Sequence, residues 1–166
     1  MDHSGRRGSS KALDGHRARR RPRTAAVVYF AGTRFERYAL PLEQVVDLAH
    51  EAGVPVIVDA AAQLPPVENL WHYTGLGADL ALFSGGKGPR GPQASGLVLG
   101  RRDLVDACRA HACPNHALGR TMKTSKENVL GLVAAVERAA AWSTCTPTST
   151  GPAAGSASPP TGSCPA

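Results

Sequence analysis

Four short apolar runs divide the central part of the chain, and each is bounded by Gly, Pro or charged residues. The runs are continuous, without a polar residue at every second position, and such runs are typical of buried strands. They predict four strands, at Ala25–Phe30, Val54–Asp59, Leu80–Phe83 and Ser95–Gly100. The pattern therefore indicates a sheet that forms the core of one domain.

Helical periodicity fills most of the space between these runs. Pro41 is expected to open a helix that runs to Ala52 and ends at Gly53, the usual pattern of proline first and glycine after. Three more helices are predicted, at Val67–Tyr73, Arg102–Ala112 and Lys126–Ala141, with Thr124 and Glu127 as a capping box for the last one. Residues 32–37 are expected to form a loop.

The order of these elements predicts the fold class. Strand, helix and strand of this length form a right-handed βαβ unit with parallel strands. The link from Phe83 to Ser95 is short, so the last strand is expected to pair antiparallel. We therefore predict an α/β fold, a mostly parallel sheet with flanking helices.

The strand ends carry the candidate chemistry. Asp59 ends the second predicted strand and Lys87 follows the third, and ligands of open α/β sheets bind at the carboxyl ends of strands. A lysine can form a Schiff base with pyridoxal phosphate (PLP), and a carboxylate can keep its pyridine nitrogen protonated. A buried strand-end acid also needs a cationic partner, which a pyridinium would supply. A P-loop is excluded because Gly88 stands where Ser or Thr is required.

The segment Ser84–Gln93, SGGKGPRGPQ, carries a family resemblance. It is similar to the lysine-bearing half of the large domain of fold-type I PLP-dependent enzymes, and it resembles the selenocysteine synthase family most. That family comprises L-seryl-tRNA selenium transferase and related sugar-amino-acid ammonia-lyases, and class V aminotransferases carry a comparable motif. The resemblance covers about Thr24 to Trp142, so we expect a fragment of the PLP-dependent transferase large domain.

The resemblance implies roles for individual residues. Lys87 would be the Schiff-base lysine and, once released, the general base at the substrate's Cα. Four further residues would bind the cofactor: Asp59 at the ring nitrogen, Ala61 on the ring face, Gln63 at the 3-oxygen and Ser84 at the phosphate. Candidates for the substrate's carboxylate or phosphate are Arg90 and Arg120 first, and then Arg34, His116 and Lys123.

The expected function is lyase or transferase chemistry at Cα–Cβ of an amino acid or amino sugar acid. Elimination, transamination and selenium transfer share their first steps, so the motif leaves the choice among them open. A homodimer is expected if the site is complete, because fold-type I sites are usually built at a dimer interface. The alternative is a truncated homologue without activity of its own, since neither the segment that cradles the cofactor phosphate nor a small domain is recognisable.

The chain ends differ from the core in composition. The full chain has a net charge of +6, and residues 1–23 account for all of it with eight basic and two acidic residues. This Arg-rich head is a distant candidate for nucleic-acid binding, although it lacks interleaved aromatic residues. We expect residues 1–23 to be a disordered basic head, residues 24–142 the enzyme-like domain, and residues 143–166 a disordered low-complexity tail.

Cysteine use and hydropathy suggest a compartment. The four cysteines form no CxxC pair, so no metal site is expected, and Cys108 is predicted to pack on the apolar face of its helix. No secretory signal and no membrane-spanning run is recognisable. We therefore expect a cytoplasmic location.

Overall fold

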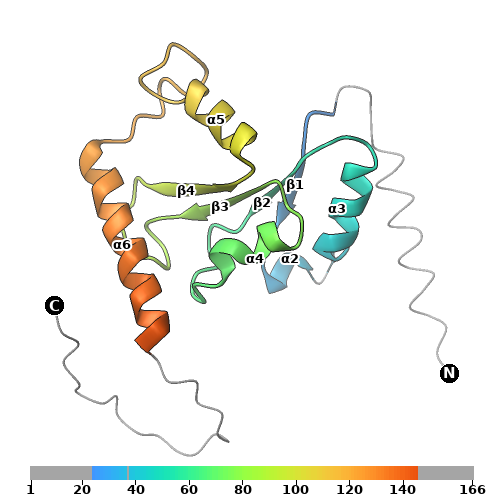
Figure 1. Cartoon of the computed structure of the whole chain (residues 1–166), viewed down its shortest axis with the longest axis horizontal. Helices are drawn as coiled ribbons and strands as arrows, with labels where there is room; N and C mark the ends of the chain where they lie inside the picture. Colours follow the sequence, from blue (N-terminus) through green and yellow to red (C-terminus); the bar gives the residue numbers. More distant parts are fainter. Residues whose placement is uncertain (1–23, 37, 146–166) are drawn as a thin grey trace, which may run out of the picture.

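The computed structural model describes the backbone of residues 24–36 and 38–145 and the side chains as far as residue 141. Figure 1 shows the sheet with helices around it. The strands are β1 (Val27–Phe30), β2 (Val56–Asp59), β3 (Leu80–Ser84) and β4 (Gly96–Gly100). The helices are α2 (Thr33–Glu36), α3 (Leu42–His50), α4 (Asn69–Gly75), α5 (Arg102–His111) and α6 (Lys126–Cys145). None of the described helices is long and apolar enough to cross a membrane.

The sheet has the order β1-β2-β3-β4. The first three strands pair in parallel, and β4 pairs antiparallel with β3. Phe30 pairs with Asp59, and Asp59 with Leu82, so the ends of the three parallel strands lie at one edge. The predicted fold class and the antiparallel last strand are both confirmed.

One face of this sheet is covered by α3 and α4, which lie in front of it in Figure 1. Side chains alternate along a strand, so Tyr29, Val58 and Ala81, which pair with one another, point to the same face. Val58 and Ala81 are fully buried there. The apolar face of α3 packs on this row through Leu42, Val45, Val46 and Ala49, all buried. These contacts form the hydrophobic core.

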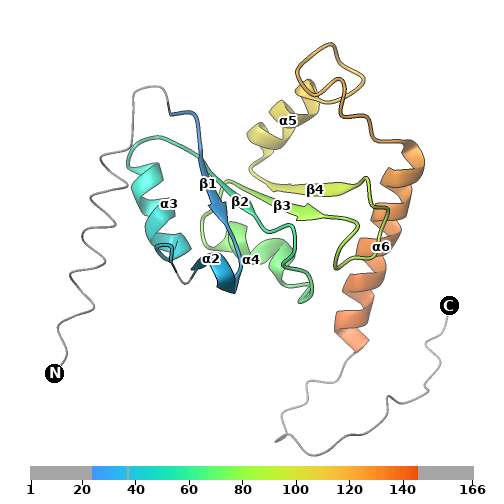
Figure 2. The ribbon, with the colours of Figure 1, turned by 180° about the vertical axis from the view of Figure 1, so that it is seen from behind.

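The other face has no such cover in the described part of the chain, and Figure 2 shows its strands from that side. Its apolar side chains are Val28, Phe30, Ile57, Leu80, Leu82 and Val98, which we call the open face, and of these only Leu80 is buried. Phe30 is 53% exposed and Val28 55%. Parallel sheets normally have both faces buried, so this exposure is unusual. Asp59 pairs with Phe30 and Leu82 and therefore shares the open face.

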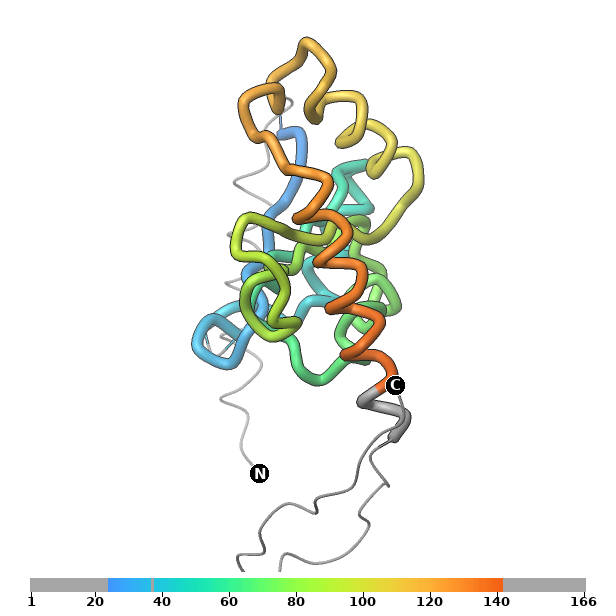
Figure 3. The backbone as a smooth tube through the Cα atoms, turned by 90° about the vertical axis from the view of Figure 1, so that its left-hand side faces the viewer, coloured from blue at the N-terminus to red at the C-terminus, as the bar shows by residue number. Residues whose placement is uncertain are grey.

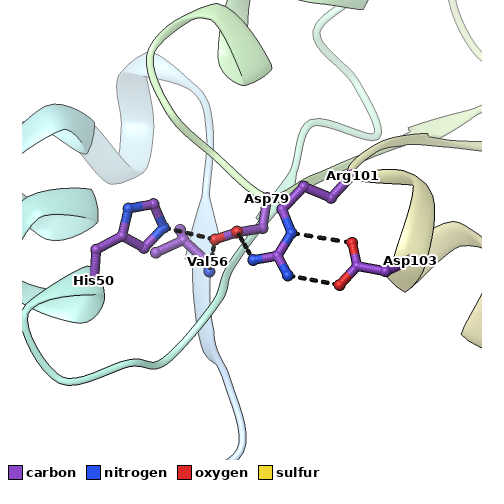
Figure 4. Close-up of polar contacts among 5 residues, drawn as sticks. All are labelled: His50, Val56, Asp79, Arg101 and Asp103. Carbon is purple, nitrogen blue, oxygen red and sulfur yellow. Dashed lines mark hydrogen bonds and ion pairs between the residues drawn. The ribbon is translucent and has the colours of Figure 1, made fainter.

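The amino end of the sheet is held by a polar network around Asp79, drawn in Figure 4. Asp79 is only 3% exposed. Its carboxylate accepts hydrogen bonds from His50 Nε2 at 2.8 Å and from the Val56 N–H at 2.7 Å. Arg101 Nη1 donates to its other oxygen at 2.8 Å, and Arg101 also holds Asp103 with two hydrogen bonds. The network joins α3, β2, β3 and the start of α5.

Two local predictions were wrong. Helix α2 forms where a loop was expected, because the Gly32 carbonyl accepts the Phe35 and Glu36 N–H groups while the Glu36 carboxylate accepts the Gly32 N–H. Cys108 is exposed, because α5 has no buried residue and does not dock into the core.

Helix α6 also differs from its prediction at both ends. Its first turn is capped by Ser125, whose Oγ accepts the Asn128 N–H at 3.2 Å. The cap is thus one residue after Thr124, where the predicted capping box begins. The helix continues to Cys145, past the predicted end at Ala141 and into the segment expected to be disordered. The other expectations for residues 1–23 and for the tail beyond residue 145 lie outside the described residues.

Candidate active site

Lys87 lies in a closed turn between β3 and β4, residues 85–91, which we call the Lys87 turn. The Gly91 N–H donates to the Gly85 carbonyl at 2.8 Å, and the Arg90 N–H donates to the Lys87 carbonyl at 3.0 Å. The Gly85 N–H is bonded to the Ser95 carbonyl at 2.9 Å, which anchors the turn to the segment before β4. Lys87 itself is exposed. The backbone of the turn is therefore fixed while its lysine is free to reach a ligand.

The Lys87 turn packs directly against the segment that follows Asp59. A Cβ placed on Gly88 would lie 1.9 Å from the carbonyl oxygen of Leu64. Only glycine allows this approach, because any side chain would overlap the Leu64 backbone. The contact brings the loop after β2 and the loop after β3 together at the carboxyl edge of the sheet.

Helix α6 supports the turn from another side, as Figure 3 shows. Leu132 and Ala135 are buried, at 6% and 4% exposure. A Cβ on Gly85 would lie 2.7 Å from Leu132 Cδ1, and one on Gly131 would lie 2.8 Å from Pro92 Cγ. The turn is thus held between α6 and the Leu64 segment.

Asp59 lies half-buried at the end of β2, and the segment that follows it contacts the Lys87 turn through Leu64. Its Oδ1 accepts the Ala61 N–H at 3.0 Å, and no other hydrogen bond to its side chain exists within the described residues. The Ala61 carbonyl in turn accepts the Ser84 N–H at 3.3 Å, which joins the ends of β2 and β3. Ser84 is two residues beyond Leu82 in β3, so it shares the open face with Asp59.

These residues fit pyridoxal phosphate as a ligand. One carboxylate oxygen of Asp59 lacks a hydrogen-bond partner among the described residues, and a pyridinium N–H would supply one. Ala61 is small, and Ser84 offers a hydroxyl at the end of the adjacent strand. Lys87 would supply the amine. Asp59, Ala61, Ser84 and Lys87 were all predicted from sequence, and the structure brings them to one edge.

The remaining predicted residues are placed less directly. Gln63 donates its amide to the Ala31 carbonyl at 3.2 Å, so it is engaged with the end of β1. Arg90 is on the Lys87 turn itself, with a left-handed φ of 57°. Arg120 lies in the loop between α5 and α6, where its guanidinium donates to the Pro114 carbonyl. The structure does not bring Arg120 to the Lys87 turn, and His116 and Lys123 lie in the same distant loop.

A groove of about 760 Å³ runs beside the turn, between α6 and residues 64–70. Arg90 lines it together with Arg138, which comes from the second half of α6, and with Glu68. Sequence reasoning missed Arg138. Its position depends on the packing of α6 across the turn, and no local pattern reports such long-range packing. Among the described residues no cluster of three or more His, Cys, Asp or Glu side chains could hold a metal ion.

Comparison with known proteins gives the family. The family model of aminotransferase class-V matches residues 6–139, which is most of the chain. The chain belongs to the aminotransferase class-V family. Pyridoxal phosphate is the cofactor of this family, as the lysine and aspartate at the strand ends predicted.

Individual relatives of this class-V chain include enzymes with different reactions. A 5'-C-glycyluridine monooxygenase-decarboxylase of a Streptomyces species is 44% identical over 116 residues, 69% of this chain and 27% of the relative. An L-seryl-tRNA(Sec) selenium transferase of Desulfovibrio desulfuricans is 32% identical over 105 residues, 58% of this chain and 21% of the relative. The predicted resemblance to selenocysteine synthases is thus confirmed, whereas a monooxygenase-decarboxylase was not foreseen.

A solved structure supports the fold. The structure of a D-glucosaminate-6-phosphate ammonia-lyase superposes with a TM-score of 0.65 at 32% identity, over 80% of this chain and 33% of that one. The class-V chain therefore spans about a third or less of the length of these relatives. The ammonia-lyase is one of the sugar-amino-acid enzymes that the motif resembles.

Proposed function

We propose that this class-V chain carries the lysine-bearing part of a pyridoxal phosphate site, with Lys87 as the residue that binds the cofactor covalently. The packing of Gly88 against the Leu64 carbonyl is the main support, because it holds the Lys87 turn beside the loop that leaves Asp59. Asp59 and Ser84 share one face at the same edge. If Lys87 and Asp59 were ordinary surface residues, the two loops that carry them would not need such close backbone packing.

Each residue has a distinct task in this proposal. When bound, pyridoxal phosphate withdraws electrons from the substrate's Cα. Asp59 would hold a proton at the ring nitrogen through its free carboxylate oxygen, and Ser84 would donate a hydrogen bond to the phosphate. Ala61 leaves room for the ring. Once released from the cofactor, the Lys87 amine would take and return the proton at Cα, which is general acid–base catalysis by a positioned lysine. Gln63 would reach the cofactor's 3-oxygen only by leaving the Ala31 carbonyl.

The proposed substrate is an amino-acid-type small molecule. The names of the relatives include a glycyl-nucleoside, a glucosaminate phosphate and a seryl-tRNA, and each contains an amino acid unit. Arg90 is the proposed carboxylate or phosphate contact, because it is on the Lys87 turn and lines the groove beside it. Arg120 could make this contact only after a rearrangement of its loop.

A homodimer and a cytoplasmic location remain part of the proposal.

The first test is an absorbance titration of the purified chain with pyridoxal phosphate. The native chain should develop the absorbance band of a lysine-bound cofactor, and Lys87→Ala should abolish it. Lys123→Ala is the matched control, because Lys123 is an exposed lysine in the α5–α6 loop. Asp59→Asn should weaken cofactor binding by about tenfold or more, because the neutral amide removes a charge-assisted hydrogen bond.

Two outcomes would contradict the proposal. An equal band in Lys87→Ala would assign binding to other lysines. A folded chain that gives no band at all would favour the truncated homologue without activity of its own. Circular dichroism of each variant separates loss of binding from loss of folding.

A further inference from the structure

A second cavity lies on the covered face of the sheet, between α2, α3 and α4. Its volume is about 340 Å³. Its polar lining consists of Tyr29, Glu36, Glu43, His72 and Tyr73, and we call it the tyrosine pocket. It is separate from the proposed cofactor site, because Tyr29 and Asp59 point to opposite faces of the sheet.

Two mostly buried tyrosines open their hydroxyls into this pocket. Tyr29 and Tyr73 are each only 7% exposed. Neither hydroxyl has a hydrogen-bond partner among the described residues, and no described side-chain oxygen is both fully buried and unpaired. Both hydroxyls must therefore reach accessible space, and the tyrosine pocket is the cavity that both residues line. The hydroxyls are thus accessible to a ligand, and no described residue competes for their hydrogen bonds.

The pocket is also acidic. Glu36 uses one carboxylate oxygen, Oε1, to accept the Gly32 N–H at 2.9 Å, and Glu43 has no hydrogen-bond partner for its side chain in the described part of the chain. Burial raises the pKa of Tyr29, and the charges of Glu36 and Glu43 raise it further. Burial and then Glu36 raise the pKa of Tyr73. The hydroxyls thus stay neutral, and together with the carboxylates they present hydrogen-bond acceptors in a negative field.

We infer that the tyrosine pocket binds an organic cation that donates hydrogen bonds, a primary ammonium or a guanidinium group. Such a group has three to five N–H donors, which match the two carboxylates and the two hydroxyl oxygens. An anion would be repelled by Glu36 and Glu43, and a quaternary ammonium would leave the acceptors unpaired.

The test is a titration of the isotopically labelled 166-residue chain with n-butylammonium, without pyridoxal phosphate, followed by ¹H–¹⁵N NMR. The amide signals of Gly32, Glu43 and His72 should shift and saturate. Glu43→Gln should weaken binding by about tenfold, because it removes one charge-assisted contact. Asp47→Asn is the matched control, because Asp47 is an exposed acid on the same helix that does not line the cavity. Its affinity should equal that of the native chain.

Three further results decide the inference. Tetramethylammonium and n-butanol should shift these signals much less, because one cannot donate hydrogen bonds and the other has no charge. Equal shifts with tetramethylammonium, or an unchanged affinity in Glu43→Gln, would overturn the inference. Arg37 follows Glu36 and lies outside the described residues. Binding that occurs only in Arg37→Ala would also overturn the inference, because the guanidinium of Arg37 would then be the group that occupies the pocket in the native chain.

Discussion

At the scale of single residues, the proposed cofactor site depends on glycines as much as on its charged groups. Lys87 and Asp59 could be predicted from residue type and from their positions after apolar runs. The contacts that bring them together could not, because Gly88 meets Leu64 and Gly85 meets Leu132 across long sequence separations. A glycine-rich turn in the sequence indicates close backbone approach without naming the partner.

Gly88→Ala tests this close packing. The added Cβ would overlap the Leu64 carbonyl, so the free energy of unfolding should fall by about 1–3 kcal/mol, and the Lys87 turn should shift. Gly75→Ala is the control, because a Cβ there meets nothing within 4 Å at the end of α4. It should change stability by no more than about 1 kcal/mol. Urea unfolding measures both, and equal effects would contradict the packing described for the turn.

At the scale of elements, the strands and long helices follow from hydrophobic periodicity, whereas their ends depend on individual hydrogen bonds. The predicted bounds of the strands agree with the structure to within two residues. Helix α2 was missed because its stabilising bonds join Gly32 and Glu36, a pair that no common capping pattern contains. The Asp79 network was missed as well, because His50 and Arg101 are remote from Asp79 in sequence.

Asp79→Asn should show how much this network contributes. The amide would place an N–H group toward the donors of His50, Val56 and Arg101, so the free energy of unfolding should fall by about 3 kcal/mol at pH 7. Asp106→Asn alters only an exposed pair with Arg102 and should cost no more than about 0.5 kcal/mol. Comparable losses in the two variants would contradict a structural role for the network.

The same network predicts a dependence on pH. Burial raises the pKa of Asp79, but hydrogen bonds from His50, Val56 and Arg101 outweigh it and hold the pKa below its usual value. Its stabilising effect is therefore complete above the unfolded-state pKa of about 3.9 and is lost as the pH falls through the lower folded-state value. The stability gap between the native chain and Asp79→Asn should shrink below about pH 4. A gap that stays constant down to pH 2 would contradict this assignment.

At the scale of the whole molecule, the sheet has one covered face and one open face. The α/β class was predictable, because strand–helix–strand order permits few topologies. The open face was not, because the run Val27–Phe30 is apolar on both sides and Val56–Asp59 departs from this only at Asp59. The chain spans 33% of the ammonia-lyase chain with which it superposes. An exposed face that includes Asp59 is consistent with a site that needs further protein to be complete.

Two valines on opposite faces test this asymmetry. Val58 is fully buried, and Val58→Ala should lower the free energy of unfolding by about 2 kcal/mol. Val28 is 55% exposed, and Val28→Ala should cost no more than about 0.5 kcal/mol. Equal losses would show that the open face is covered in solution. Analytical ultracentrifugation would then reveal whether a second copy covers it.

The most direct test of the central claim is to locate the bound cofactor chemically. The chain has four lysines, Lys11, Lys87, Lys123 and Lys126, so reduction of the pyridoxal phosphate complex with borohydride followed by peptide mapping can distinguish them. The proposed site predicts that at a one-to-one ratio the modified lysine is Lys87, and that Asp59→Asn lowers its yield. Modification spread over the four lysines, or concentrated on Lys123 or Lys126, would contradict the proposal that Lys87 is the cofactor lysine.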